Sequence, residues 1–449
     1  MSAGTDLDVA VVGAGMAGLT AAAELQRAGM DVRVFESCEH VGGRTATFRR
    51  DGYLVDTGAE QISPSGYRAT WRLIEQAGLG TGDLPRLGGT MALWRDGRVR
   101  PGVAETRGML TGAGLSPRAR LDLARFRAWA WRRRAWFDTD HPERSPLRGT
   151  TIAEFARRYH PDLHDYLLQP VAGTFFGWSS ERSAAAVLIS LLLAVGEPGS
   201  WRTYRDGMDT PARLLAADLD VRTGTAVHQV VSEQDSARLE TSDGTVRARS
   251  VLLCVPAPEA ARVHANPDAD ASAYLAACSF APALKVSCML DRPLAMSADN
   301  PPYVLLTPAV TEDVLSAVLF DHVKHPGRAP AGKGLLTLMP AARTTRGLID
   351  APDEVVRERL VEAAARYLPE LPAADRGGFV HRHRHGLPEA TPEALHRRPR
   401  FMQRPVGPVD YAGDWVMLRP ASEGAVRSGA LAASRALSRM RGRRAPAPA

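Results

Sequence analysis

A glycine-rich turn between a short apolar run and a helical stretch constrains this chain more than any other feature. The run Val9–Val12 is typical of a buried parallel strand, and Gly13, Gly15 and Gly18 follow it with G-x-G-x-x-G spacing. Gly13 permits a tight turn, Gly15 lets the backbone approach a pyrophosphate, and Gly18 allows close packing of helix on strand. The N-terminus of the following helix, Leu19–Ala28, offers free N–H groups to phosphates. The turn therefore predicts a dinucleotide-binding unit.

The residues after this helix complete the unit. A second strand is predicted at Asp31–Phe35, and it ends at Glu36, 23 residues after Gly13, where a carboxylate can accept ribose hydroxyls. The segment Gly42–Thr45 then adds a second close backbone approach, and its arginine supplies a cation for the pyrophosphate. A nicotinamide-binding unit has no need of that second glycine pair.

These motifs resemble the FAD-binding start of the flavin amine oxidase and protoporphyrinogen oxidase superfamily. Tyr411–Trp415 and Ser422–Gly429 are similar to the closing motif of the same superfamily. The resemblance implies FAD as the cofactor, with Asp414 on the ribityl chain. It also implies a helix that starts in the second segment, with its positive end directed at the flavin pyrimidine.

The resemblance carries a full set of cofactor-binding residues. They are Gly13, Gly15, Ala17, Gly18, Glu36, Gly43, Arg44, Gly58, Ala59, Glu60, Val227, Gly413, Asp414, Glu423, Ala425 and Val426. Superfamily members that hold FAD covalently use a cysteine shortly before the closing motif. No cysteine follows Cys288 here, so non-covalent FAD is expected. The four cysteines also lack metal-ligand spacing, and no metal is predicted.

Lys285 is the main catalytic candidate. The surrounding run Ala283–Pro293 resembles the strand on which amine oxidases carry a lysine, which holds a water against flavin N5. The alternative is a strand lysine that faces solvent. The chain has only three lysines, Lys285, Lys324 and Lys333, beside 53 arginines, so a coincidental match is improbable.

The segment Asp56–Gln61 matches the part of the superfamily that passes the flavin ring. A carboxylate at Glu60 could hold a substrate ammonium or act as a base, and the equally weighted alternative is a pair with an arginine. Ala421 stands where many amine oxidases place an aromatic residue two positions before the closing glutamate. A simple benzylamine pocket is therefore doubtful, and a bulkier substrate is expected.

The separation of the two cofactor motifs predicts an interleaved α/β architecture of two domains. The resemblance implies a Rossmann-like FAD domain of the glutathione-reductase type from segments 1–80, 203–264 and 407–440. An α+β substrate domain would take 81–202 and 265–406, and 441–449 would be a disordered tail. Predicted helices are Arg118–Phe137, Ile152–Tyr159, Ala184–Val195 and Asp353–Tyr367; predicted strands are Thr225–Val231, Ala237–Thr241, Val246–Ala248, Val251–Pro256, Leu284–Leu290, Val314–Phe320 and Leu335–Met339.

Composition limits the choice of partners. The net charge of +6 is small for a chain in which 24% of the residues are charged. It does not by itself indicate a nucleic-acid partner. The basic, aromatic stretch 125–137 could rest on an anionic membrane, but a surface helix that buries one aromatic edge is favoured. His381–His385 alternates with arginines that would repel a metal, so a strand beside the substrate cavity is expected. No signal peptide is visible and no apolar run is long enough to span a bilayer, which predicts a cytoplasmic protein. A monomer or homodimer is expected.

The favoured function is an oxidase that takes hydride from a carbon bearing nitrogen in a small-molecule metabolite. The imine product would form with H2O2, because O2 would reoxidise the flavin. The alternative is a C–C desaturase of the phytoene desaturase or protoporphyrinogen oxidase type. A flavoprotein without turnover is the third hypothesis. A role in natural-product biosynthesis fits the arginine-rich, GC-biased composition.

Overall fold

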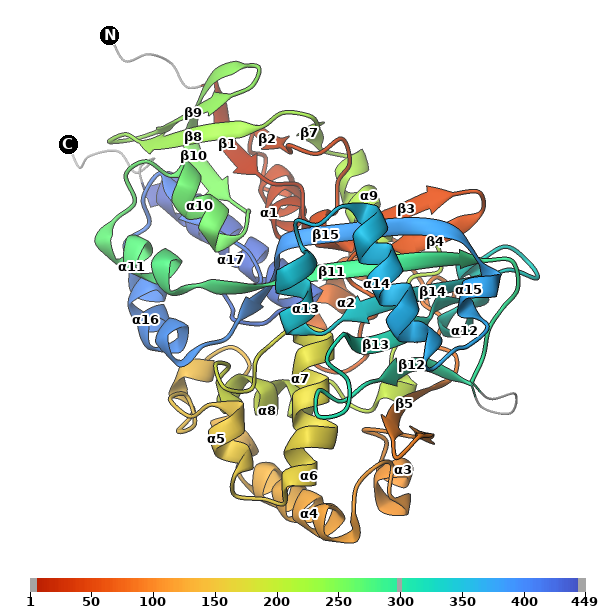
Figure 1. The fold of residues 1–449 in the computed structure, drawn as a ribbon. Helices are drawn as coiled ribbons and strands as arrows, with labels where there is room; N and C mark the ends of the chain where they lie inside the picture. Colours follow the sequence, from red (N-terminus) through yellow and green to blue (C-terminus); the bar gives the residue numbers. More distant parts are fainter. Residues whose placement is uncertain (1–5, 297–300, 443–449) are drawn as a thin grey trace, which may run out of the picture.

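The computed structural model describes residues 6–296 and 301–442. Its architecture is mixed α/β, with two seven-stranded sheets and a helical lobe that closes one end of the molecule (Figure 1). The predicted tail 441–449 lies largely outside the described residues.

The first sheet gathers strands from three distant parts of the chain. Its order is β7-β2-β1-β10-β9-β8, and β16 pairs with β10 outside this path. The strands are β1 (Leu7–Val12), β2 (Val32–Phe35), β7 (Asp220–Arg222), β8 (Val227–Ser232), β9 (Ala237–Thr241), β10 (Gly244–Leu253) and β16 (Val409–Tyr411). Strands β2, β1, β10 and β16 run parallel, which is why β1 reads as a nearly continuous apolar run. The helices α1 (Met16–Arg27) and α17 (Ser422–Gly442) belong to the apolar core of this sheet.

Strand β10 corrects one prediction. The two runs expected at Val246–Ala248 and Val251–Pro256 form one strand, Gly244–Leu253. Its first half pairs antiparallel with β9, and its second half pairs parallel with β1 and β16. The polar residues between the two apolar runs therefore mark a change of partner and not a break in the strand.

The second sheet has the order β15-β11-β14-β13-β12-β5-β6. Its strands are β5 (Thr90–Arg95), β6 (Arg98–Pro101), β11 (Ser279–Leu290), β12 (Pro302–Leu306), β13 (Leu315–Phe320), β14 (Gly334–Pro340) and β15 (Asp375–Glu389). Helix α14 (Asp353–Ala365) shares the core formed by β11, β13 and β14. The predicted strands at 284–290, 314–320 and 335–339 are confirmed to within a few residues at each end.

The helical lobe is built from the part of the chain that follows β6 and precedes β7. It contains α3 (Thr106–Thr111), α4 (Pro117–Arg132), α5 (Ile152–Ala156), α6 (Pro161–Leu163), α7 (Gln169–Phe176) and α8 (Ala185–Ala194), with short turns η2 (Arg134–Trp136), η3 (Pro142–Arg144), η4 (His164–Leu168) and η5 (Pro198–Ser200). In Figure 1 this lobe lies at the end of the molecule opposite strands β8 and β9. The predicted helix Arg118–Phe137 ends at Arg132, and a single 3-10 turn follows it.

Further helices, turns and strands connect the elements given above. They are η1 (Gly43–Thr45), β3 (Thr47–Arg50), β4 (Tyr53–Asp56), α2 (Arg68–Gln76), α9 (Thr210–Ala217), α10 (Ala257–Val263), α11 (Ala269–Ala277), α12 (Asp321–Lys324), η6 (Pro326–Arg328), α13 (Ala342–Leu348), α15 (Leu371–Ala374) and α16 (Pro392–Gln403). Among the described residues, no helix is long and apolar enough to cross a membrane.

Candidate active site

One cavity of about 1080 Å³ runs between the two sheets and into the helical lobe. At one end it is lined by the glycine-rich turn after β1 and by the segment that leads into α17. At the other end it is lined by α7, α8 and the second sheet. Two sheets and one lobe therefore converge on a space large enough for a cofactor and a substrate.

The glycine-rich turns form a cradle of bare backbone at the first end. Gly13 has φ +101°, and its N–H donates to the Phe35 carbonyl at 2.8 Å, which aligns the turn with the end of β2. Gly15 is the N-cap of α1, and a Cβ added there would meet no protein atom within 4 Å. Gly42 donates to the Ala14 carbonyl at 2.8 Å, so the second glycine pair lies beside the first. This open backbone at a helix N-terminus fits the pyrophosphate of FAD.

Glu36 is held at the end of β2 by backbone N–H groups. Its Oε2 accepts from the Ala14 N–H at 2.7 Å and its Oε1 accepts from the Cys38 N–H at 2.9 Å. Each carboxylate oxygen can accept more than one hydrogen bond, so lone pairs remain for hydroxyls in the cavity. Glu36 therefore lines the cavity with a carboxylate that can accept hydrogen bonds from the hydroxyls of a ribose.

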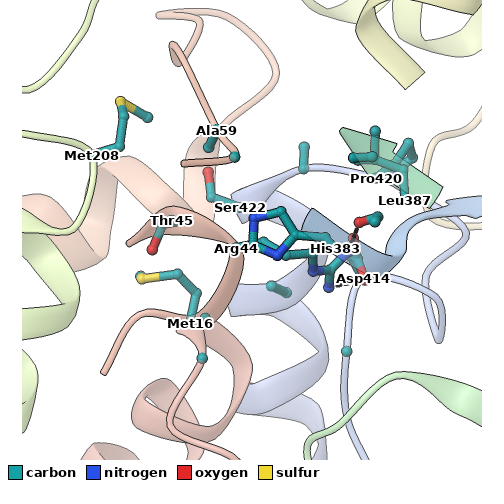
Figure 2. Close-up of a pocket in the computed structure, with 18 of the residues that line it drawn as sticks. Met16, Arg44, Thr45, Ala59, Met208, His383, Leu387, Asp414, Pro420 and Ser422 are labelled. Atoms are coloured by element: carbon teal, nitrogen blue, oxygen red, sulfur yellow. Dashed lines mark hydrogen bonds and ion pairs between the residues drawn. The ribbon is translucent and has the colours of Figure 1, made fainter. Parts of the chain in front are cut away.

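Arg44 and Asp414 join the two cofactor motifs across the cavity wall. Two parallel hydrogen bonds of 2.8 Å connect the guanidinium to the carboxylate (Figure 2). Arg44 also donates to the Gly386 carbonyl at 2.7 Å, which ties this pair to β15. Asp414 is 5% exposed, so the bidentate pair is the means by which its charge is balanced.

Lys285 and Glu60 both line the cavity and form an ion pair with each other. The Lys285 Nζ, on β11, donates to the Gly58 carbonyl and to Glu60 Oε1. The other carboxylate oxygen of Glu60 accepts from Lys324. Each oxygen of Glu60 thus accepts from a lysine ammonium, and its negative charge is balanced within the chain. This arrangement favours the ion-pair alternative for Glu60, with lysines in place of the expected arginine, over an ammonium ligand for substrate.

Behind the cavity wall this pair extends into a buried charge cluster of six residues: Asp56, Glu60, Lys285, Asp321, Lys324 and Arg328. Lys324 Nζ lies 2.9 Å from Asp321 Oδ1 and 3.4 Å from Asp56 Oδ2. Arg328 lies 2.9 Å from the same Asp56 carboxylate. The cluster holds three carboxylates and three cations, so its formal charge is zero.

Burial and pairing oppose each other in this cluster. Burial alone would lower the pKa of Lys324, but the carboxylates of Asp321, Glu60 and Asp56 outweigh it, and the pKa lies above its usual value. Burial likewise raises the pKa of Asp56, and the charges of Arg328 and Lys324 then bring it below its usual value. Both groups are therefore ionised at neutral pH.

His383 gives the cavity a neutral hydrogen-bond acceptor. Its Nε2 lies 3.2 Å from the Thr57 carbonyl, which can only accept, so Nε2 carries the hydrogen and Nδ1 carries the lone pair. Burial, followed by the charges of Arg44 and Lys285, lowers the pKa of His383 to about 4. The ring is neutral at pH 7 and lines the cavity close to the Arg44–Asp414 pair (Figure 2).

The far end of the cavity is apolar. Its walls come from α7, α8 and the second sheet, with Val171, Phe175, Leu188, Leu191, Val304 and Met339 among the lining residues. No acidic or basic side chain of the described residues reaches the cavity from α7, α8, β5, β12, β13 or β14. This region accommodates bulk without offering a charge.

Most of the predicted residues line this one cavity. They are Gly13, Gly15, Ala17, Glu36, Gly43, Arg44, Gly58, Ala59, Glu60, Val227, Lys285, Gly413, Asp414 and Ala425. They come from positions up to 412 apart in the chain. Ala421, which replaces the expected aromatic residue, lines the cavity as well.

Three predicted cofactor residues lie outside the cavity lining. A Cβ on Gly18 would lie 2.0 Å from the Gly13 carbonyl oxygen, so this glycine serves the packing of helix on turn. The Glu423 carboxylate accepts from the Ala69 and Thr70 N–H groups at 3.2 and 2.8 Å and thereby caps the start of α2. Val426 is buried in the core with α1. Its side chain contacts protein where a ligand contact was expected.

Sequence reasoning missed Lys324 and His383. The scarcity of lysine that singled out Lys285 applied equally to Lys324, and two of the three lysines are buried in one cluster. The histidine strand was expected beside the cavity, but nothing local distinguished His383 from His381. Among the described residues, no group of three or more potential ligands is placed to hold a metal ion.

Comparison with known proteins agrees with this geometry. A model of the family described as flavin containing amine oxidoreductase matches residues 16–437. Coproporphyrinogen III oxidase of Propionibacterium freudenreichii is 34% identical over 185 residues, which are 40% of this chain and 34% of that relative. The chain thus spans about a third or less of the length of the first curated relatives that it matches.

Solved structures share the fold over nearly the whole chain. Putrescine oxidase bound to putrescine superposes with a TM-score of 0.78 at 20% identity, over 96% of this chain and 99% of that one. Cyclohexylamine oxidase from Brevibacterium oxydans gives a TM-score of 0.77 at 18% identity, over 97% and 100%. Identities this low establish a common fold and leave the substrate open.

Proposed function

Because this chain belongs to the flavin containing amine oxidoreductase family, we propose that it is an FAD-dependent oxidase acting on a C–N bond. The substrate would be a bulky amine or amide-type metabolite, and the products an imine and H2O2. Lys285 on the cavity wall is the observation that carries this proposal. Its ammonium has three N–H donors, of which Gly58 and Glu60 take two. The third is available to a water or substrate atom in the cavity.

When bound, FAD supplies a two-electron acceptor for hydride and passes the electrons to O2. The chain's own residues supply position and charge. The glycine cradle and Glu36 hold the dinucleotide, the Arg44–Asp414 pair braces the two motifs, and Lys285 is held in place by Glu60. Neutral His383 offers an acceptor for an N–H or O–H donor. The apolar end holds the bulk of the substrate and excludes water.

The domain boundaries fit the same proposal. We assign the FAD domain to 1–80, 203–264 and 407–440, and the substrate domain to 81–202 and 265–406. Every strand of the first sheet falls in the former ranges and every strand of the second sheet in the latter, which supports this division.

A C–C desaturase is the second candidate. The apolar end of the cavity favours it, because a substrate without nitrogen requires no charged partner there. Peroxide release and flavin bleaching by the purified yellow protein, over panels of amines and of apolar polyenes, separate the two. Bleaching by amines alone supports the oxidase, and bleaching by polyenes alone replaces it with the desaturase.

Lys285→Met tests the role of the lysine. Methionine keeps the apolar stem but removes the donors. We expect FAD to remain bound while flavin reduction or reoxidation slows by about tenfold or more, equivalent to about 1.4 kcal/mol in the barrier. Stopped-flow absorbance of the flavin measures both half-reactions. Lys333→Met, at an exposed lysine, is the matched control and should leave both rates unchanged.

A different outcome would change the assignment. If both rates in Lys285→Met equal those of the parent while the free energy of unfolding falls, Lys285 is a structural member of the charge cluster. The desaturase would then become the favoured function.

A further inference from the structure

The outer side of α4 and η2 exposes large apolar side chains. Leu110 at the end of α3, Trp131 and Leu121 are 73%, 63% and 57% exposed, the highest values among the described large apolar residues. Trp136 in η2 is 46% exposed. The helix already buries its opposite side through Leu123 and Phe126. These side chains are therefore surplus to the packing of the lobe.

The net formal charge of the same segment equals that of the whole chain. Residues 117–136 contain seven arginines and one aspartate, a formal charge of +6, and the complete chain also has a formal charge of +6. The remainder of the protein is electrically neutral. The net positive charge thus lies on α4 and the turn that follows it, at one end of the molecule (Figure 1).

These arginines are not neutralised within the chain. Of the seven, only Arg125 has a carboxylate partner among the described residues, Asp122 at 3.2 Å. Arg134 stacks on the Trp131 ring at 4.7 Å, and Arg133 lies 5.2 Å from the Trp136 ring. In the part of the chain that the structure describes, the exposed tryptophans and leucines of this surface are not covered by other apolar side chains, and most of its guanidinium groups have no carboxylate partner.

We propose that this basic aromatic face, formed by Leu110, Arg118, Leu121, Trp131, Arg132 and Trp136, docks on an anionic lipid surface. Tryptophan rings settle at the level of lipid headgroups, and arginines pair with anionic headgroups around them. A second copy of this chain would bring +6 against +6 across a twofold axis, so charge argues against self-association. Helix α4 lies at one end of the molecule, where a flat surface can approach it (Figure 1). Docking would be peripheral, since no described helix can span a bilayer.

Vesicle sedimentation of the FAD-loaded protein tests the proposal. The probes are phosphatidylcholine vesicles with and without about 30% phosphatidylglycerol. We expect about tenfold or greater preference for the anionic vesicles, and loss of that preference at about 0.5 M NaCl, where screening is short-ranged. Arg118→Glu/Arg132→Glu should lower binding by about tenfold or more.

Matched variants separate location from overall charge. Arg343→Glu/Arg346→Glu makes the same change of charge on exposed arginines in the first and last turns of α13 and should bind like the parent. Trp131→Ala/Trp136→Ala should also weaken binding by about tenfold. Its control is Val310→Ala/Val355→Ala, at exposed apolar residues elsewhere.

Three results would overturn the proposal. One is no preference for anionic vesicles, and another is equal loss in the α13 control. The third is a parent protein that binds neither kind of vesicle but binds polyglutamate, with that binding lost in Arg118→Glu/Arg132→Glu. That result would assign the face to an acidic polypeptide. Retained flavin absorbance in every variant confirms that each one is folded. Because vesicle binding is measured and not activity, these outcomes do not depend on which bond the enzyme oxidises.

Discussion

At the scale of single residues, Glu60 shows how a functional candidate and a structural ion pair can be the same group. Its carboxylate faces the cavity, yet both oxygens are bound to lysines. Lys324 in turn is fully buried and contacts three carboxylates. The position of Lys285 at the cavity therefore depends on a residue that has no access to the cavity.

Replacing Lys324 should destabilise the protein strongly. Lys324→Met leaves three buried carboxylates with two cations, and breaking a buried ion network in this way costs about 3–5 kcal/mol of unfolding free energy. Lys324→Arg keeps the charge and should cost less. Urea unfolding followed by tryptophan fluorescence measures both, with exposed Lys333→Met expected to stay within about 0.5 kcal/mol of the parent. Equal stability of Lys324→Met and the parent would show that the cluster is dispensable.

At the scale of elements, β15 brings a row of histidines and arginines to the edge of the second sheet. His381 lies opposite Lys285 on β11, and its Nε2 is buried without a hydrogen-bond partner. Burial, followed by the charge of Lys285, lowers the pKa of His381 to about 4. Arg382 pairs with Asp353 at the start of α14, and Arg384 pairs with Asp350 in the loop before it. His381 is therefore neutral at neutral pH, as His383 is on the same strand.

This strand should make stability fall as the pH is lowered. In the unfolded chain His381 takes up a proton below about pH 6.5, whereas in the folded protein it stays neutral down to about pH 4. Between pH 7 and pH 5 the group should cost the folded state about 1–2 kcal/mol. His381→Phe removes this titration, so the difference in unfolding free energy between variant and parent should change by that amount over the same interval. An unchanged difference would place the protonation elsewhere.

Local chemistry explains which elements were predictable. The turn from Gly13 to Gly18, the strand end at Glu36 and the strand at 284–290 depend on neighbours in the sequence, and each was located to within a few residues. Glu423 was assigned to the cofactor from the resemblance of the closing motif, and its hydrogen bonds to the N–H groups at the start of α2, 353 and 354 residues away, were not foreseen. Strand β10 was divided because its exchange of partners depends on strands far along the chain. Contacts of this kind leave no periodicity to detect.

At the scale of the whole molecule, the cavity determines how the cofactor is held. Cys254 is the one described cysteine that lines it. Burial, with a smaller effect of Asp410, raises the pKa of the Cys254 thiol well above its usual value. A protonated thiol is a poor nucleophile, so a covalent bond to flavin is disfavoured.

Acid precipitation tests non-covalent binding. We expect trichloroacetic acid to release all of the yellow colour into the supernatant, because FAD that is not covalently bound is lost when the protein unfolds. Cys254→Ala should behave like the parent. A yellow pellet from the parent and a colourless one from Cys254→Ala would instead identify a thioether at this residue.

The pair between Arg44 and Asp414 also has a consequence for how the protein is made. The two residues are 370 positions apart, and β16 and α17 complete the first sheet from the same late segment. At about 5–20 residues per second, a ribosome delivers Asp414 roughly 20–70 s after Arg44. During that interval the glycine-rich turn is without its counterpart. FAD can be held by both motifs only after β16 and α17 have been made, so complete binding of the cofactor follows the synthesis of this segment.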